Sequence, residues 1–88
     1  MSMNQEEIVG EIVRYLHQTN PLAAERGELP LDESLYEIGV LDSFGVVETV
    51  DFIERHWSIR ILDAEITVEK FGSLNKMARL VREKIDAK

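Results

Sequence analysis

The sequence predicts an all-α domain, a four-helix bundle with three main helices and one short third helix. Three segments carry apolar residues at helical spacing, and a long loop containing both prolines separates the first two. The 88 residues, 44% of them hydrophobic, suffice for one compact domain but not for two. We therefore expect residues 1–88 to form a single domain.

The first main helix is expected from Gln5 to about Thr19, where apolar residues recur every three to four positions. Asn20 and Pro21 follow and supply a stop signal. Residues 1–4 are expected to be a loose end. The apolar positions of this helix are Ile8, Val9, Ile12, Val13, Tyr15 and Leu16.

Residues 21–42 are expected to form a long, packed loop, with a short turn of helix near Glu33–Ile38. The segment has scattered apolar anchors but no sustained period. A loop of this length inside a small domain is usually functional or disordered, and its regular leucines favour an ordered, functional loop. The anchors are Leu29, Leu31, Leu35, Ile38 and Leu41.

The second main helix is expected to begin at Asp42 or Ser43, both good N-cap residues, and to run to about Trp57. Steps of 100° per residue place Val46, Val50, Ile53 and Trp57 on one arc, which we predict to face the core. Phe44 and Phe52 fall away from that arc, beside Glu48, Asp51 and Arg55. At least one aromatic ring is therefore expected on an acidic, solvent-facing side, and Phe52 is either there or half-buried at its flank.

Beyond this helix, Ile59 and Ile61 resemble a short extended link, and residues 63–67 can form one weak helical turn. A last helix is expected from about Ser73 to Ile85, with residues 86–88 as a second loose end. Its inner side is predicted to carry Leu74, Met77, Ala78, Val81 and Ile85.

Composition excludes several classes of function. The net charge of −7 disfavours nucleic acid, and the absence of cysteine excludes disulfides, thiolate metal sites and cysteine nucleophiles. Neither a secretory signal nor a membrane-spanning run occurs, so we expect a soluble, cytoplasmic protein. His17 and His56 have no companion at a metal-ligand spacing, so no metal site is predicted. Residues 1–54 hold twelve acidic and two basic residues, which concentrates the negative charge there.

The chemistry-bearing motif is the Asp42-Ser43 pair, which places a hydroxyl at the start of an acidic helix just after the long loop. Taken alone, such a pair is an ordinary helix N-cap. A serine hydrolase is not supported, because the residue two before Ser43 is Leu41 rather than the glycine of Gly-x-Ser-x-Gly. No catalytic residue is predicted, and the chain is not expected to be an enzyme.

The order of helix, leucine-bearing loop, Gly-x-x-Asp-Ser-hydrophobic motif, acidic helix, short helix and final helix resembles the acyl carrier protein family over almost the whole chain. Leu31–Gly39, with the sequence LDESLYEIG, is similar to the family's segment that leads into its modified serine. Trp57–Ile61 is similar to the family's link after the second helix.

This resemblance implies that 4′-phosphopantetheine, derived from coenzyme A, is attached to Ser43 by a magnesium-dependent phosphopantetheinyl transferase. The arm's thiol would then carry acyl groups as thioesters, which reconciles thioester chemistry with a cysteine-free chain. The further partners implied are a loading ligase or transferase for acyl or aminoacyl groups, and acyl-processing enzymes with basic docking patches. We expect the carrier to be a monomer.

The family's docking face maps onto the second main helix. Asp42 flanks the attachment point, and Phe44 and Val47 are its hydrophobic residues. Glu48 and Asp51 lie on the recognition face, and Glu54 is a weaker candidate.

The cargo is left open by two departures from the family pattern. Gly45 stands where many fatty acid carriers have an acid, and Arg55 interrupts the acidic face. The main expectation is a carrier for fatty acid, polyketide or related biosynthesis. The alternative is a D-alanyl or other aminoacyl carrier with a dedicated ligase, which residues 42–47 resemble more closely. Leu41 before Asp42 counts against a peptidyl carrier, and an unmodified helical interaction module is the remaining alternative.

Overall fold

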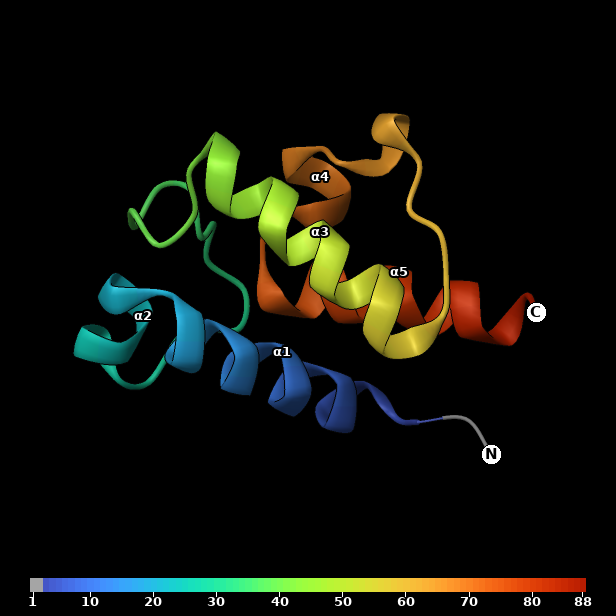
Figure 1. Ribbon diagram of the computed structural model, residues 1–88, viewed down its shortest axis with the longest axis horizontal. Helices are drawn as coiled ribbons and strands as arrows, with labels where there is room; N and C mark the ends of the chain where they lie inside the picture. The colour runs from blue at the N-terminus through green and yellow to red at the C-terminus, as the bar shows by residue number, and fades with distance from the viewer. Residues whose placement is uncertain (1–2) are drawn as a thin grey trace.

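A computed structural model describes residues 3–88, and the elements within this range are helical without a strand. In chain order they are α1 (Gln5–Thr19), α2 (Pro21–Arg26), α3 (Ser43–Trp57), the 3₁₀ turn η1 (Asp63–Glu65), α4 (Val68–Phe71) and α5 (Leu74–Asp86) (Figure 1). The all-α prediction is confirmed. The described residues contain five α-helices rather than the four expected.

Helix α1 has the bounds predicted from the sequence, and a reciprocal cap fixes its start. The Glu7 amide donates to Asn4 Oδ1 at 2.9 Å, and the Asn4 amide donates to Glu7 Oε1 at 3.1 Å. Asn4 is therefore part of the helix start and not a loose end. Residues 1–2 of the expected loose end lie outside the described residues. At the other terminus Asp86 is the last residue of α5, which corrects the expectation for that position.

The expectation that residues 21–42 form only a loop is wrong for the first six of them, which form α2. Pro21 occupies the first turn of α2, where its missing N–H has no partner to lose and its fixed φ already suits a helix. Asn20 both ends α1 and caps α2, so the helix stop is also a helix start. Gly27, at φ 80°, ends α2.

The rest of the loop is ordered, with a turn over residues 35–39 in place of the helical turn expected near Glu33–Ile38. Gly39 closes this turn at φ 81°, a backbone conformation that glycine adopts without strain. The Leu35 amide donates to the Gly72 carbonyl at 2.9 Å, and the Asn75 amide donates to the Leu31 carbonyl at 3.0 Å. These bonds tie the loop to the end of α4 and the start of α5.

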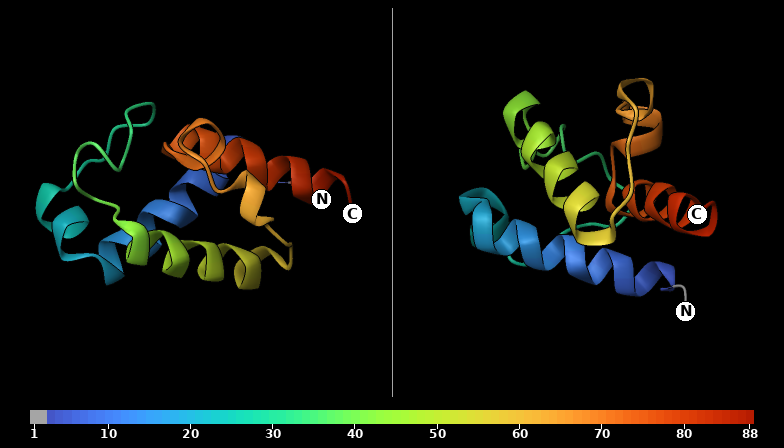
Figure 2. Two further views of the ribbon diagram at one scale, coloured as in Figure 1. Left: turned by 90° about the horizontal axis from the view of Figure 1, so that it is seen from above. Right: turned by 45° about the vertical axis from the view of Figure 1, so that its right-hand side comes forward.

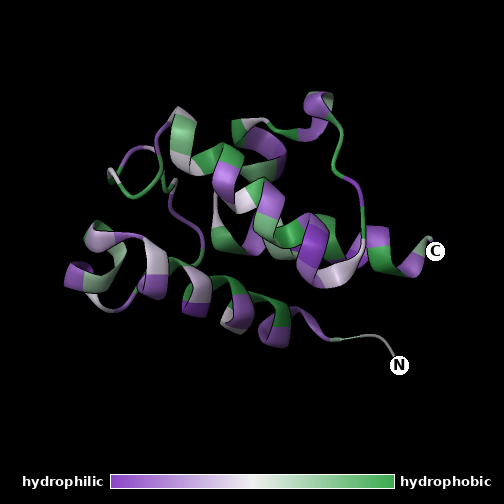
Figure 3. Cartoon of the chain, viewed as in Figure 1, coloured by the Kyte–Doolittle hydropathy of each residue, from purple (hydrophilic) through white to green (hydrophobic). Residues whose placement is uncertain are grey.

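The core lies between the three long helices, with α1 packed along α5 and α3 crossing them (Figures 1 and 2). In Figure 3 the apolar side of α1 is turned towards α3 and α5 and its hydrophilic side outward. The start of α1 and the end of α5 lie on the same side of the molecule (Figure 2). The residues at the centre of the core are Ile8, Ile12, Leu16, Leu35, Ile53, Phe71, Leu74, Met77 and Val81.

The predicted inner faces of α3 and α5 are largely confirmed. Val46, Ile53 and Trp57 are buried, but Val50 is only half-buried. Thr49 is buried on α3 instead, since its hydroxyl donates to the Gly45 carbonyl at 2.8 Å and so loses no hydrogen bond. On α5, Leu74, Met77, Ala78 and Val81 are buried as predicted, Leu80 is buried as well, and Ile85 is half-buried.

The segment between α3 and α5 is held by side-chain contacts that the sequence does not reveal. Glu54 Oε2 accepts a hydrogen bond from the Ile61 amide at 2.9 Å, which fastens the link to α3. Lys84 Nζ lies 2.7 Å from Glu65 Oε1, and this bond is the main reason that the pKa of the Glu65 carboxyl falls below its ordinary value of 4.5. A methyl group on Gly72 would lie 2.4 Å from the Val68 carbonyl oxygen, so only glycine fits where α4 ends.

None of the helices described is both long and apolar enough to cross a membrane.

Candidate functional site

Ser43 is the first residue of α3, and this helix begins where the chain leaves the long loop (Figure 1). The Ser43 side chain is exposed. Asp42 precedes it as the N-cap, and its Oδ1 accepts a hydrogen bond from the Gly45 amide at 2.7 Å. The cap satisfies one of the free amides of the first turn. The predicted Asp42-Ser43 helix start is therefore the observed one, and the Ser43 hydroxyl is accessible.

The backbone just before Ser43 is anchored by hydrogen bonds to Leu35 and Asn20 and by two buried side chains. The amides of Val40 and Leu41 both donate to the Leu35 carbonyl at 3.0 Å, and both side chains are buried. Asn20 Nδ2 donates to the Val40 carbonyl at 2.6 Å. The backbone that leads into Ser43 is therefore held in a fixed position.

Asn20 supports this segment, although its place in the sequence indicates only the end of a helix. Its Oδ1 caps α2 through the Ala23 amide at 3.1 Å, while its amide group holds Val40. The Asn-Pro order is a signal for the cap, because proline suits the position after an N-cap. Nothing local in the sequence signals the bond to Val40, which lies twenty positions away.

Asn20→Ala should lower the free energy of unfolding by about 1–3 kcal/mol, since it removes a helix cap and leaves the Val40 carbonyl without its partner. Asn20→Asp is the matched variant, because it keeps the capping oxygen but replaces the donor with a carboxylate. Urea denaturation followed by circular dichroism measures both. Equal midpoints for Asn20→Asp and the unaltered chain would show that the bond to Val40 contributes nothing.

The start of α3 can accommodate a phosphate attached to the serine oxygen. Helix α3 has 15 residues, and the free amides at the N-terminus of a helix, together with the helix dipole, favour negative charge. At Gly45 an added methyl group would approach Asp42 Oδ1 to 3.3 Å, so glycine keeps the first turn open beside the cap. A phosphodiester on Ser43 therefore fits the exposed side of this turn.

The exposed side of α3 carries four further predicted site residues. Phe44 is 71% and Val47 66% exposed, an unusual degree for large apolar side chains. Glu48 and Asp51 are exposed one to two turns further along. These four residues, on the side of α3 away from the core, are called the docking face below.

Two predicted neighbours of the docking face have other contacts. Glu54 is half-buried, and its carboxylate accepts a hydrogen bond from the Ile61 amide. This contact gives Glu54 a structural role, and its role in docking stays a prediction. Phe52 is half-buried at the α1 side, where its ring stacks on Tyr15 with centroids 4.2 Å apart. The exposed aromatic ring expected on this helix is Phe44.

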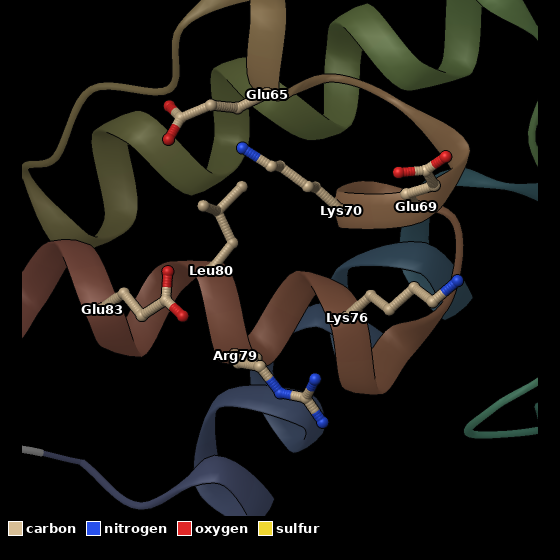
Figure 4. Close-up of a pocket in the computed structure, with 7 residues that line it drawn as sticks. All are labelled: Glu65, Glu69, Lys70, Lys76, Arg79, Leu80 and Glu83. Carbon is tan, nitrogen blue, oxygen red and sulfur yellow. The ribbon is translucent and has the colours of Figure 1, made fainter.

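A pocket between η1, α4 and α5 lies outside the docking face, and none of the predicted site residues lines it (Figure 4). Figure 4 shows Lys70 extending from α4 towards Glu65, with Glu83 across from them. Its lining holds equal numbers of acidic and basic residues. The charged residues are Glu65, Glu69 and Glu83 with Lys70, Lys76 and Arg79.

Both histidines are engaged in contacts between segments. His17 Nε2 hydrogen-bonds to the Gly27 carbonyl, and His56 Nε2 lies 3.4 Å from Glu11 Oε2. Within residues 3–88, no three histidine or acidic side chains gather in a group that could hold a metal ion.

Comparison with known proteins finds D-alanyl carrier proteins among the relatives of this chain. The D-alanyl carrier protein of Streptococcus sanguinis (strain SK36) is 36% identical over 53 residues, which cover 60% of this chain and 67% of that protein. The D-alanyl carrier protein of Streptococcus mutans serotype c (strain ATCC 700610 / UA159) is 34% identical over 53 residues, with the same coverage. No protein-family model matches the chain.

Proposed function

The chain belongs to the phosphopantetheine-type carrier proteins and resembles D-alanyl carrier proteins, and from this premise we propose that it carries an aminoacyl group, D-alanyl above all, on a 4′-phosphopantetheine arm attached to Ser43. The observation that carries the attachment site is the exposed Ser43 hydroxyl at the capped start of a 15-residue helix. When bound, the arm supplies the thiol that forms the thioester.

Ser43 and the residues around it would each have a separate role in a carrier. Ser43 Oγ supplies the protein oxygen of the phosphodiester. The unbonded amides of the first turn of α3 favour the phosphate charge, and Asp42 fixes the geometry of that turn through Gly45. Val40 and Leu41 hold the turn in place from below.

The aminoacyl cargo is favoured over the fatty or polyketide cargo that was the main expectation. The relatives are D-alanyl carrier proteins, and they lend no support to fatty acid biosynthesis. The departures at Gly45 and Arg55 also separate α3 from the acidic helix of fatty acid carriers. A dedicated ligase that activates D-alanine is therefore the proposed loading partner, after a phosphopantetheinyl transferase has installed the arm.

The test has two stages, each read by intact mass. Incubation with coenzyme A, Mg²⁺ and a broad-specificity phosphopantetheinyl transferase should add one phosphopantetheinyl group. The modified chain, given ATP and a D-alanine-activating ligase, should then gain one alanyl group that hydroxylamine removes. A chain that is never modified contradicts the carrier proposal. If a fatty acyl ligase loads the modified chain but the D-alanine ligase does not, only the proposed cargo is contradicted.

We further propose that partner enzymes with basic patches bind the docking face. Glu48→Lys/Asp51→Lys should slow modification by the transferase about ten-fold or more at low salt, because steering by complementary charge acts mainly on the association rate. The effect should shrink as salt rises. Initial rates of modification at low and high salt measure it.

The control is Glu33→Lys/Glu37→Lys, which makes the same change of net charge on the exposed loop. Both double variants should keep the fold, since all four side chains are exposed and surface ion pairs such as Asp51–Arg55, at 3.1 Å, are individually weak. Slower modification of the loop variant, with an unchanged rate for the α3 variant, would place the docking surface on the loop.

A further inference from the structure

A groove lies between α2 and the turn that precedes α3. Leu22, Glu25 and Arg26 form its α2 wall, and Ile38 and Val40 form the opposite wall. Its volume is about 320 Å³, which is within the range of small-molecule sites. Figure 1 shows α2 and the start of α3 at the same end of the molecule. No residue of the docking face lines this groove, so it is a separate feature of the surface.

The groove lies within reach of the Ser43 oxygen. Val40 is three residues before Ser43, so their Cα atoms are at most about 11 Å apart even in a fully extended chain. Asn20 holds the Val40 carbonyl at 2.6 Å, which fixes the start of α2 beside this segment. A phosphopantetheine arm, with amide units and methylene groups in series beyond its phosphate, is longer than this distance. Such an arm can therefore lie in the groove while it is attached to Ser43.

The chemistry of the groove changes along its length. Leu22 is 56% exposed and lies across from Ile38, so both offer apolar surface that a ligand can cover. Glu25 and Arg26 follow Leu22 by three and four residues, which places all three on one face of α2. Because the start of α2 is the end bonded to Val40, the charged pair lies farther from the attachment segment than Leu22 does. The ion pairs between described residues do not include Glu25 or Arg26.

We propose that this groove is the resting site of the loaded arm, with the dimethyl group of its pantoyl unit over Leu22 and Ile38 and the D-alanyl ammonium against Glu25. Arg26 donates to the carbonyl oxygen of the thioester. The inference rests on the proposed function for the arm and its aminoacyl cargo. It assigns to α2 a role in holding that cargo between visits to the partner enzymes.

The charged end of the groove selects an aminoacyl cargo over a fatty one. A D-alanyl thioester has an ammonium group and a carbonyl oxygen close together, and these complement a carboxylate and a guanidinium. A fatty acyl chain has no ammonium and would place methylene groups against Glu25 and Arg26, which removes water from both charges without replacing it by a partner. Because exposed ion pairs are individually weak, we expect the arm to occupy the groove for only part of the time.

The experiment attaches the arm chemically and so needs no phosphopantetheinyl transferase. The chain has no cysteine, so Ser43→Cys supplies a single thiol. Its sulfur displaces bromide from a pantetheine analogue that is bromoacetylated at its hydroxyl end and carries D-alanine as an amide at the other end, and intact mass verifies the product. NMR of the methyl-labelled chain should show nuclear Overhauser contacts from the pantoyl methyl groups to Leu22 and Ile38. Absence of these contacts in the attached product would overturn the proposal.

A second analogue, with propionyl in place of D-alanyl, tests the ammonium. The shift of the Glu25 amide on attachment reports the bound fraction in fast exchange, and it should be about two- to five-fold smaller for the propionyl analogue. Glu25→Gln should remove this difference, whereas the matched Glu33→Gln on the loop should preserve it. Equal shifts for both analogues with Glu25 in place would contradict its assignment to the cargo. Because no enzyme attaches the arm, neither negative result bears on whether Ser43 accepts phosphopantetheine.

Discussion

Ser43→Ala should abolish attachment of phosphopantetheine completely, with no gain in mass after incubation with coenzyme A and transferase. The variant removes the oxygen on which the phosphodiester would form, and none of the remaining serines has both an aspartate before it and an acidic helix after it. Alanine at this position should not disturb the fold. Asp42 caps α3 through its own side chain, and the Ser43 side chain is exposed.

Ser34→Ala is the control for this prediction. Ser34 lies in the same loop region, and its hydroxyl accepts the Glu37 amide at 3.3 Å, so its loss tests whether a general weakening of the loop prevents modification. The control should be modified like the unaltered chain. Appearance of the modified mass in Ser43→Ala would move the attachment site elsewhere and remove the basis of the proposed function.

Ile53→Ala should destabilise the fold by about 2–5 kcal/mol, the second large effect expected here. The Ile53 side chain is completely buried among the three long helices, so truncation removes buried apolar atoms and leaves a cavity. Val50→Ala, one turn earlier on the same helix, is the matched comparison. Because Val50 is half-buried, the same kind of truncation there should cost only about 0.5–1.5 kcal/mol.

Fluorescence of Trp57, the single tryptophan, follows unfolding in urea for both variants. The midpoint should fall much further for Ile53→Ala than for Val50→Ala, with little change in slope. Equal midpoints would mean that the rotation of α3 about its axis differs from the one described, and with it the composition of the docking face.

The long helices could be predicted because their signals are local. Asn4, Asp42 and Ser73 are N-caps whose side chains bond within one turn, and the apolar period behind each cap extends over 13 residues or more. The sequence does not reveal helix α2, because a proline that follows one helix can mark its end as well as the first turn of another. Helix α4 has four residues, too few for a period to emerge.

The residues of the site also fall into those that neighbouring sequence predicts and those that depend on contacts between distant segments. Ser43 and its cap Asp42 follow from neighbouring residues, and the outward side of α3 follows from its helical phase. The anchoring of Val40 by Asn20, and the use of Glu54 to hold Ile61, depend on segments that meet only after folding. The burial of Thr49 in place of Val50 has the same origin, since a threonine becomes acceptable in the core once its hydroxyl reaches the Gly45 carbonyl.

Trp57 joins the two ends of the described chain at the far end of α3 from Ser43. Its indole N–H donates to the Met3 sulfur at 3.0 Å, and Lys88 Nζ donates to its carbonyl at 2.9 Å. At about 1.5 Å per residue, the 15 residues of α3 separate this point from Ser43 by about 20 Å. An affinity tag, a surface linker or a fused protein at either end would therefore stand well clear of the serine. The protein can therefore be immobilised through either end for kinetic work without blocking access to Ser43.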